Sequence, residues 1–194
     1  MVPTDTINIF QKNWAFTSAD SPVSKIKTGT FGPCYVVSFT SGKYAAMAHI
    51  DDTTKVDSMK AIFDRFKQNL VPIKDIKVII LGGWNEHPES FKWGQKIVKR
   101  IHDEGFENVS TKNMYLKKTK TVFERVMKED PIKANTPFYH LGALIDAKDG
   151  KTYILKEYNN ELDTEQARQT HEFYKKWGHD IMSAEENMTE IPSP

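Results

Sequence analysis

The sequence predicts an α+β fold, a sandwich with a mixed or antiparallel β-sheet and flanking helices. Short runs of β-branched and aromatic residues occur both in hairpins and singly, which is typical of such a sheet. Longer segments with apolar residues at steps of three and four separate these runs, as in amphipathic helices. We see no internal repeat and no linker, so the 194 residues fit one domain with a real core.

Composition argues against several classes of protein. Hydrophobic residues make up 39% of the chain and charged residues 27%, which is ordinary for a soluble globular protein. The formal net charge of +1 gives no reason to expect nucleic acid or a membrane as a partner. No apolar run approaches the roughly 18 residues of a membrane span, and the N-terminus lacks the order of a secretory signal. We therefore expect a cytoplasmic protein or, if it is a bacterial effector, one translocated into a host cell.

Short apolar runs predict the strands, and turn residues separate them. Ser41 and Gly42 predict one tight turn, and 148–150 (Lys-Asp-Gly) predicts another. The run that stops at Gly82 and Gly83 predicts a central strand. The predicted strands cover 7–10, 23–28, 35–39, 44–50, 76–81, 108–116, 138–145 and 151–158.

Amphipathic periodicity predicts the helices. The first covers 54–70, and Asp52, Thr53 and Thr54 are competent caps at its start. Its apolar stripe contains Val56, Met59, Ile62, Phe63, Phe66 and Leu70. The second begins with Pro88 at the favoured first position and ends before Gly105. Its predicted buried face contains Phe91, Gly94, Ile97, Val98 and Ile101.

The end of the chain is less regular. A third amphipathic helix is predicted over 163–177, whereas 117–135 is basic, then mixed, and indicates no particular element. The residues from Ser183 onward are polar and end in proline. We therefore predict a single domain over 1–182 and a disordered tail over 183–194.

The chain contains one cysteine, so its candidate chemistry is that of a single thiol. A lone cysteine excludes an internal disulfide and a multi-cysteine zinc site. The other histidines show no metal-ligand spacing, and we expect neither a metal nor a cofactor. Cys34 follows a Gly-Pro corner and leads into one predicted strand, while His49 lies at the end of the next. Two adjacent antiparallel strands can bring this thiol and this imidazole together.

A thiol beside an imidazole is the minimum for nucleophilic catalysis by cysteine. The imidazole lowers the pKa of the thiol and later supplies a proton, and a third group fixes the imidazole tautomer. The hydroxyl of Thr28, six residues before Cys34, can serve as that group. On residue type alone, a buried and inert thiol is the commoner state of such a cysteine.

The residues around Cys34 and His49 resemble the motifs of two families of amide hydrolases. Residues 28–34 (TGTFGPC), with AMAH ending at His49, resemble the chemoreceptor glutamine deamidase family, whose Cys-His core bacterial deamidase toxins share. Residues 30–176 resemble the eukaryotic protein N-terminal asparagine amidohydrolase. The segments CYVVSFTSG, AHIDDTTK and VIILGGW, an amphipathic helix and the hairpin FYHLGALIDAKDGKTYIL follow in the same order.

The resemblance implies a deamidase-like fold and hydrolysis of a side-chain carboxamide. The expected reaction converts an N-terminal asparagine of a protein or peptide to aspartate, releases ammonia and feeds a degradation signal. Cys34 would attack the amide carbon, His49 would move the proton, and Thr28 would orient His49. The backbone N–H of Cys34 and one from a neighbouring loop would bind the oxyanion. Pro33 has no N–H and stands where relatives often carry serine or threonine.

Five residues are candidates for binding the substrate. Asp51 matches the aspartate of the amidohydrolase's His-x-Asp segment and is our candidate for holding a free ammonium group. It is equally a candidate cap for the following helix. Gly82 and Gly83 either leave room for a peptide backbone or form a plain turn. Trp84 and Glu86 are the remaining candidates for lining the site.

The same residues are compatible with two other functions. A deamidase acting on an internal glutamine or asparagine of a partner protein would share the chemistry without needing a free amine. A non-catalytic binding module on the same fold would leave Cys34 unreactive toward thiol alkylators. A thiol protease or transglutaminase is disfavoured, because no suitable His-Asn or His-Asp pair can be placed. The expected partner is a protein or peptide bearing asparagine or glutamine, and the sequence does not indicate the oligomeric state.

Overall fold

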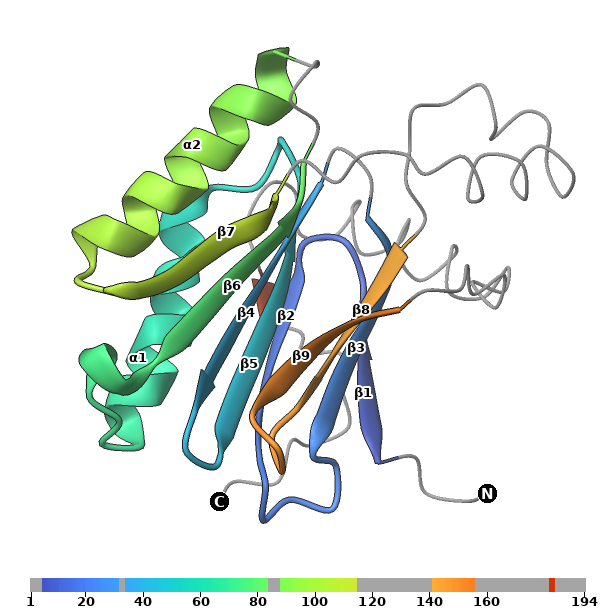
Figure 1. Ribbon diagram of the computed structural model, residues 1–194, viewed down its shortest axis with the longest axis vertical. Helices are drawn as coiled ribbons and strands as arrows, with labels where there is room; N and C mark the ends of the chain where they lie inside the picture. The colour runs from blue at the N-terminus through green and yellow to red at the C-terminus, as the bar shows by residue number, and fades with distance from the viewer. Residues whose placement is uncertain (1–4, 32–33, 84–87, 115–140, 156–181, 184–194) are drawn as a thin grey trace, which may run out of the picture.

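The computed structural model describes residues 5–31, 34–83, 88–114, 141–155 and 182–183. This part of the chain forms an α+β structure in layers, as the sequence predicts (Figure 1). Helices α1 (Lys60–Gln68) and α2 (Pro88–Asp103) cover one face of a six-stranded sheet. The other face of that sheet packs on a four-stranded sheet.

The larger sheet is mixed and has the strand order β10-β2-β5-β4-β6-β7. Its strands are β2 (Asn13–Ser18), β4 (Tyr35–Ser41), β5 (Tyr44–Ile50), β6 (Lys77–Gly82), β7 (Asn108–Met114) and β10 (Met182–Ser183). Strands β2, β5, β4 and β6 pair antiparallel, whereas β7 pairs parallel to β6 and β10 parallel to β2. The β4–β5 hairpin turns at Gly42, whose φ of 55° suits glycine.

The smaller sheet has the order β1-β3-β8-β9. Its strands are β1 (Thr6–Ile9), β3 (Lys25–Phe31), β8 (Leu141–Asp146) and β9 (Lys151–Leu155). Strand β1 pairs parallel to β3, and the other two pairs are antiparallel. The β8–β9 hairpin turns through 147–150, which confirms the turn predicted around Gly150.

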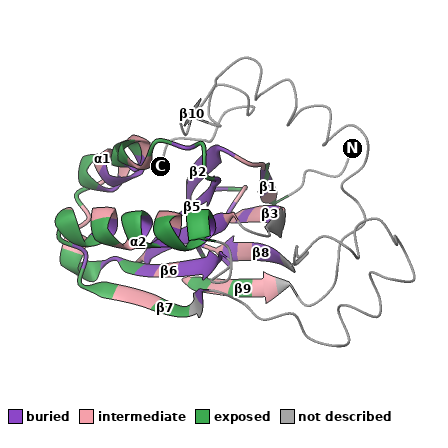
Figure 2. Ribbon diagram, turned by 90° about the horizontal axis from the view of Figure 1, so that it is seen from above, coloured by how far each residue is buried: buried purple, intermediate pink, exposed green. Residues whose placement is uncertain are grey.

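The core lies on both sides of the larger sheet, because its central strands are buried on both faces (Figure 2). Successive side chains point to opposite faces of a strand. Tyr35, Val37 and Phe39 therefore pack under the helices, with Phe63 and Phe66 of α1. The intervening residues face the smaller sheet and form a second cluster with it. That inter-sheet cluster contains Ile7, Ile9, Ala15, Ile26, Val36, Ala45, Met47, Leu81, Ala143, Ile145 and Ala147.

The first predicted helix is interrupted, and its ends differ from the prediction. It consists of the 3₁₀ turn η1 (Val56–Met59) followed by α1, and neither begins with a side-chain cap. The prediction that Asp52, Thr53 or Thr54 caps this helix is therefore wrong. Leu70, which the apolar stripe predicts to be buried, is 89% exposed with a φ of 57°. It occupies the left-handed position that closes the helix, and the N–H of Val71 bonds to the carbonyl of Phe66.

The second helix begins at Pro88, as predicted, and packs along a slightly different face. The Tyr35 hydroxyl donates a hydrogen bond of 2.7 Å to the carbonyl oxygen of Ser90. The face toward the sheet therefore runs through Ser90, Gly94, Ile97 and Ile101, all of which are buried. Phe91 is one residue, or about 100°, away from Ser90 around the helix. It is 41% exposed, so its predicted burial is wrong.

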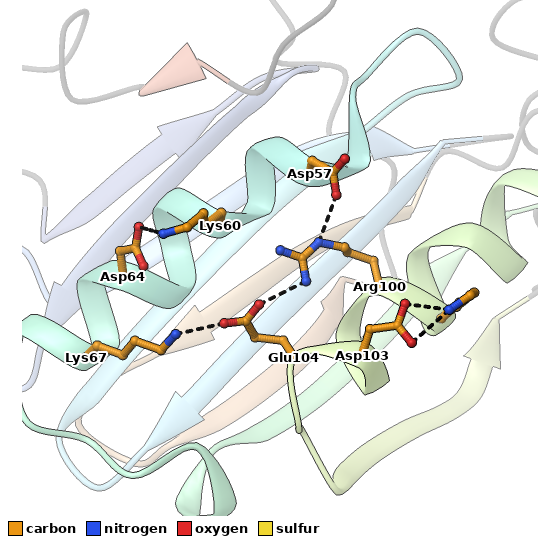
Figure 3. Close-up of polar contacts among 8 residues, drawn as sticks. Asp57, Lys60, Asp64, Lys67, Arg100, Asp103 and Glu104 are labelled. Carbon is orange, nitrogen blue, oxygen red and sulfur yellow. Dashed lines mark hydrogen bonds and ion pairs between the residues drawn. The ribbon is translucent and has the colours of Figure 1, made fainter.

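Ion pairs join the two helices on their outer side (Figure 3). Lys67 lies 2.8 Å from Glu104, Glu104 lies 3.0 Å from Arg100, and Arg100 lies 3.1 Å from Asp57. The Arg100 guanidinium also lies over the ring of Phe63, 5.2 Å from its centroid. The network therefore connects η1, α1 and the end of α2 above the aromatic core.

Several predicted segments lie partly or wholly outside the described residues. They are the irregular segment 117–135, the third helix at 163–177, and the outer ends of the late hairpin. Strand β7 is described as far as Met114, and the last two residues of its predicted range, 115–116, lie outside the described residues. Ser183, the first residue of the predicted tail, is part of β10, and the remainder of the tail is not described. No helix in the described ranges has both the length and the apolar character needed to cross a membrane.

Candidate active site

The first component of the site is the thiol of Cys34, one residue before β4 begins. In the β4–β5 pair, Val36 lies directly opposite His49, so these two side chains share one face. Cys34 is two residues before Val36 and packs, half-buried, against the same inter-sheet cluster. The thiol and the imidazole are therefore diagonal neighbours on one face, a relationship that typically spans about 7–8 Å. The register of the hairpin therefore places the thiol and the imidazole on one face of the sheet.

The second component is a buried hydrogen bond that crosses between the two sheets. Thr28 Oγ1, on β3 of the smaller sheet, lies 2.8 Å from His49 Nδ1, on β5 of the larger sheet. Thr28 is 1% exposed and His49 is 4% exposed. When Nδ1 carries the proton and donates it to Oγ1, the lone pair of the imidazole is on Nε2. Nε2 is buried and has no hydrogen-bond partner within the described residues.

Burial keeps this imidazole neutral. Removal from water lowers the pKa of His49 from 6.5 to about 4, while the negative charge of Asp51 acts in the opposite direction. The charged imidazolium is therefore a minor form at neutral pH. A neutral imidazole with an unpaired nitrogen can accept a proton, and the lowered pKa makes it a weaker base than a free imidazole.

Asp51 is buried and organises the turn after β5. Its Oδ1 accepts hydrogen bonds from the Thr53 N–H (3.0 Å), the Thr53 hydroxyl (2.8 Å) and the Thr54 hydroxyl (2.8 Å). The Asp51 N–H in turn donates to Thr54 Oγ1 at 3.2 Å. This carboxylate thus holds the loop that leads to η1 and contributes negative charge near His49.

Gly82 and Gly83 lie beside Cys34 at the end of β6. Their φ values of 85° and 80° belong to the left-handed region, which favours glycine. The Gly83 N–H donates a hydrogen bond of 3.0 Å to the carbonyl of Cys34. A Cβ on Gly83 would lie 2.3 Å from atoms of the Tyr35 side chain, so a core residue fills the space above this glycine. Trp84 and Glu86, the other candidates here, lie outside the described residues.

One residue that the sequence did not indicate also contacts the thiol. Gln11, in the turn between β1 and β2, places its amide Nε2 3.2 Å from Cys34 Sγ. A glutamine in a polar turn, 23 positions before its partner, carries no recognisable signal of such a contact. Only the packing of the β1–β2 turn against the start of β4 reveals it.

Together these groups can attack a carbonyl carbon. Cys34 offers a nucleophile, His49 an unpaired nitrogen for the proton, and Thr28 a partner for the opposite nitrogen of the ring. No group of three or more His, Cys, Asp or Glu side chains that could hold a metal ion occurs in the described part of the chain.

Comparisons with known proteins give little further information. No protein-family model matches the chain, and no curated protein matches it. Among solved structures, it is similar to YlmD from Geobacillus stearothermophilus, with a TM-score of 0.42 and 10% identity over 53% of this chain and 51% of that one. It is also similar to the hypothetical protein YfiH from Bacillus licheniformis, with a TM-score of 0.38 and 9% identity over 53% of this chain and 49% of that one. The chain thus matches about half the length of each, and at such low scores neither likeness bears on its function.

Proposed function

We propose that this protein is a thiol-dependent amidohydrolase that deamidates a side-chain carboxamide of a protein or peptide. One observation carries the proposal. His49 is held at Nδ1 by Thr28 and leaves Nε2 buried and unpartnered within the described residues, on the sheet face that Cys34 shares. A purely structural histidine would be expected to satisfy both ring nitrogens, because an unpaired buried polar atom costs about 1–3 kcal/mol.

The proposed reaction has two halves. In the first, His49 Nε2 takes the thiol proton as Cys34 Sγ bonds to the amide carbon, and the carbonyl oxygen becomes an oxyanion. The oxyanion collapses, the C–N bond breaks, and the imidazolium gives its proton to the departing nitrogen, which leaves as ammonia. In the second half, Nε2 takes a proton from water, whose oxygen attacks the thioester. The C–S bond breaks, the carboxylic acid is released, and the Cys34 thiolate takes the proton back from the imidazolium.

The leading substrate is an N-terminal asparagine, which the resemblance of residues 30–176 to the amidohydrolase favours. We place this activity in the cytoplasm. Recognition of the free amine requires an acceptor, and Asp51 is the candidate carboxylate on this part of the chain.

A second candidate is an internal asparagine or glutamine of a partner protein. The observation that favours it is the role of Asp51, whose Oδ1 already accepts hydrogen bonds from Thr53 and Thr54. A carboxylate that holds a turn is less available to bind an ammonium group. An internal carboxamide needs no such partner.

Matched peptides test the proposal. Ammonia release is measured from peptides that begin with asparagine, from the same peptides with acetylated N-termini, and from peptides with internal asparagine or glutamine. Release only from the free-amine peptides supports the N-terminal substrate, and equal release from acetylated peptides rejects it in favour of the internal one. Cys34→Ala should abolish release while retaining the fold. Ammonia release that persists in this variant would overturn the catalytic assignment.

A further inference from the structure

We propose that Gln11 is a further catalytic residue of this site. Its side-chain amide donates a hydrogen bond to the sulfur of Cys34 and then to the oxyanion that forms on the attacked carbon. The role at the sulfur depends only on the contact itself, whereas the role at the oxyanion rests on the proposed function.

The contact places a donor at the reacting atom. Gln11 Nε2 lies 3.2 Å from Cys34 Sγ and donates its N–H to the sulfur. A donor in this place stabilises the thiolate over the thiol, because it interacts more strongly with the negative form. When Sγ bonds to a carbonyl carbon, negative charge moves from the sulfur to the oxygen on that carbon. In the proposed reaction the same amide then donates to that oxygen, which is bonded to the carbon that Sγ attacks.

The turn that carries Gln11 is fixed to the other half of the site. The Asn13 N–H donates to the Phe10 carbonyl at 2.9 Å, and the Phe10 N–H donates to Asn13 Oδ1 at 3.2 Å. Lys12 has a φ of 65°, and its N–H donates to the carbonyl of His49 at 2.8 Å. The β1–β2 turn is thus tied to β5 at the catalytic histidine. Gln11 is held in position before any substrate binds, which is the condition under which a donor stabilises a developing charge most effectively.

The sequence around the thiol makes such a donor useful. Pro33 precedes Cys34 and has no N–H to offer an oxyanion. A neutral amide also avoids the cost of burying a second charge beside His49 and Asp51, both of which are buried. Gln11, in the β1–β2 turn, therefore supplies the hydrogen-bond donor that Pro33 lacks.

Alkylation of the thiol tests the contact without any substrate. Because Cys34 is the one cysteine of the chain, the rate of modification by iodoacetamide at neutral pH reports on this thiol alone. Gln11→Met keeps the length of the side chain and removes the donor, and Gln11→Glu keeps its shape while replacing the donor by a negative charge. Gln11→Met should react about three- to tenfold more slowly, as expected for the loss of one hydrogen bond. Gln11→Glu should react more slowly still, because its carboxylate also repels the thiolate. Gln68→Met, on the exposed side of α1, is the matched control and should react like the wild type.

Turnover tests the role at the oxyanion. With a peptide that the wild type deamidates, Gln11→Met should lower kcat by about a hundredfold and leave KM nearly unchanged. Thermal unfolding of each variant identifies any that fails to fold. If both Gln11 variants are folded and react with iodoacetamide as fast as the wild type, the proposal is overturned. If the wild type releases no ammonia from any peptide, the proposed reaction fails on its own, while the alkylation rates still decide the role of Gln11 at the sulfur.

Discussion

The hydroxyl oxygen of Thr28 and Nδ1 of His49 lie 2.8 Å apart across the interface between two β-sheets. Thr28 belongs to β3, whose neighbours are β1 and β8, whereas His49 belongs to β5, whose neighbours are β2 and β4. The orientation of the imidazole therefore depends on how the two sheets pack. Cys34 and Gln11 reach the same region from the start of β4 and from the β1–β2 turn.

Replacement of the Thr28 hydroxyl should remove the hydrogen bond that orients His49 from the other sheet. Thr28→Val keeps the shape and leaves His49 Nδ1 unpaired, so kcat should fall on the order of a hundredfold, as for a mispositioned catalytic group. The unpaired buried nitrogen should also lower the free energy of unfolding by about 1–3 kcal/mol. Steady-state ammonia release and urea denaturation measure the two effects. Thr28→Ser retains the hydroxyl and should keep most of the activity, and equal losses in both variants would exclude a role for the hydrogen bond.

Burial of His49 should make the protein less stable in mild acid. The pKa of His49 is about 4 in the folded state and 6.5 when exposed, so the unfolded chain binds the proton first as the pH falls. The stability that depends on neutral His49 is present above pH 6.5 and is lost between about pH 6.5 and pH 4. This loss amounts to about 3 kcal/mol at roughly 1.4 kcal/mol per pKa unit.

A comparison with His49→Gln isolates this contribution from that of the carboxylates. Urea denaturation midpoints are measured for both proteins between pH 7.5 and pH 4. The free energy of unfolding should fall more steeply in the wild type than in the variant. Parallel curves would show that the imidazole is not buried in its neutral form.

Gly83 should tolerate no side chain, for two separate reasons. Its φ is 80°, and a Cβ would lie 2.3 Å from the ring and hydroxyl of Tyr35. Gly83→Ala should therefore lower the free energy of unfolding by roughly 2–5 kcal/mol, from backbone strain plus overpacking. Gly42→Ala is the matched control, because Gly42 has a φ of 55° but nothing within 4 Å of its Cβ position. It should cost only about 1–2 kcal/mol, and equal costs would mean that Tyr35 moves aside freely.

The ion pairs between the helices should contribute more than an isolated surface pair (Figure 3). Hydrogen bonds from Lys67 and then Arg100 lower the pKa of Glu104, so its contribution is present at neutral pH and is lost as acid protonates it. Glu104→Gln should lower the free energy of unfolding by about 1 kcal/mol at low salt and less at high salt. Asp103→Asn, which removes the exposed pair with Lys99, should change it by less than about 0.5 kcal/mol. Equal effects of the two substitutions would assign the network no special role.

The sequence predicts most of the strands and both described helices. Burial of one or two faces of an element requires apolar residues at regular spacings, and these spacings can be recognised in the sequence. The run from Tyr35 to Phe39 predicts a strand buried on both sides, and it is one. The predicted burial of Leu70 and Phe91 is wrong. Periodicity alone does not show where a helix ends or which of two adjacent residues faces the sheet. The closing of α1 depends on Leu70 in the left-handed conformation, whereas the asparagine that more often adopts it, Asn69, stands one position earlier with a φ of −90°.

The residues of the candidate site likewise differ in how far the sequence predicts their contacts. The shared face of Cys34 and His49 follows from a local hairpin. Thr28, the predicted partner of the imidazole, lies 2.8 Å from His49 Nδ1. Gln11 could not be predicted, because its contact depends on how a turn packs against a strand far along the chain. The space above Gly83 could not be predicted either, because Tyr35 fills it from a strand that precedes it by 48 residues in the sequence.

Because the site takes residues from two sheets, its parts form at different stages of folding. Cys34 and His49 belong to one hairpin with a two-residue loop, which a short segment can form by itself. Thr28 pairs with Ala143 on β8, so its strand is completed only when the distant end of the domain arrives. A chain that has formed the hairpin but not the smaller sheet would hold the thiol near an imidazole whose orientation is still undefined. If the proposed function holds, the arrangement of Cys34, His49 and Thr28 is complete only after the two sheets have packed, so a partly assembled chain would not hydrolyse amides.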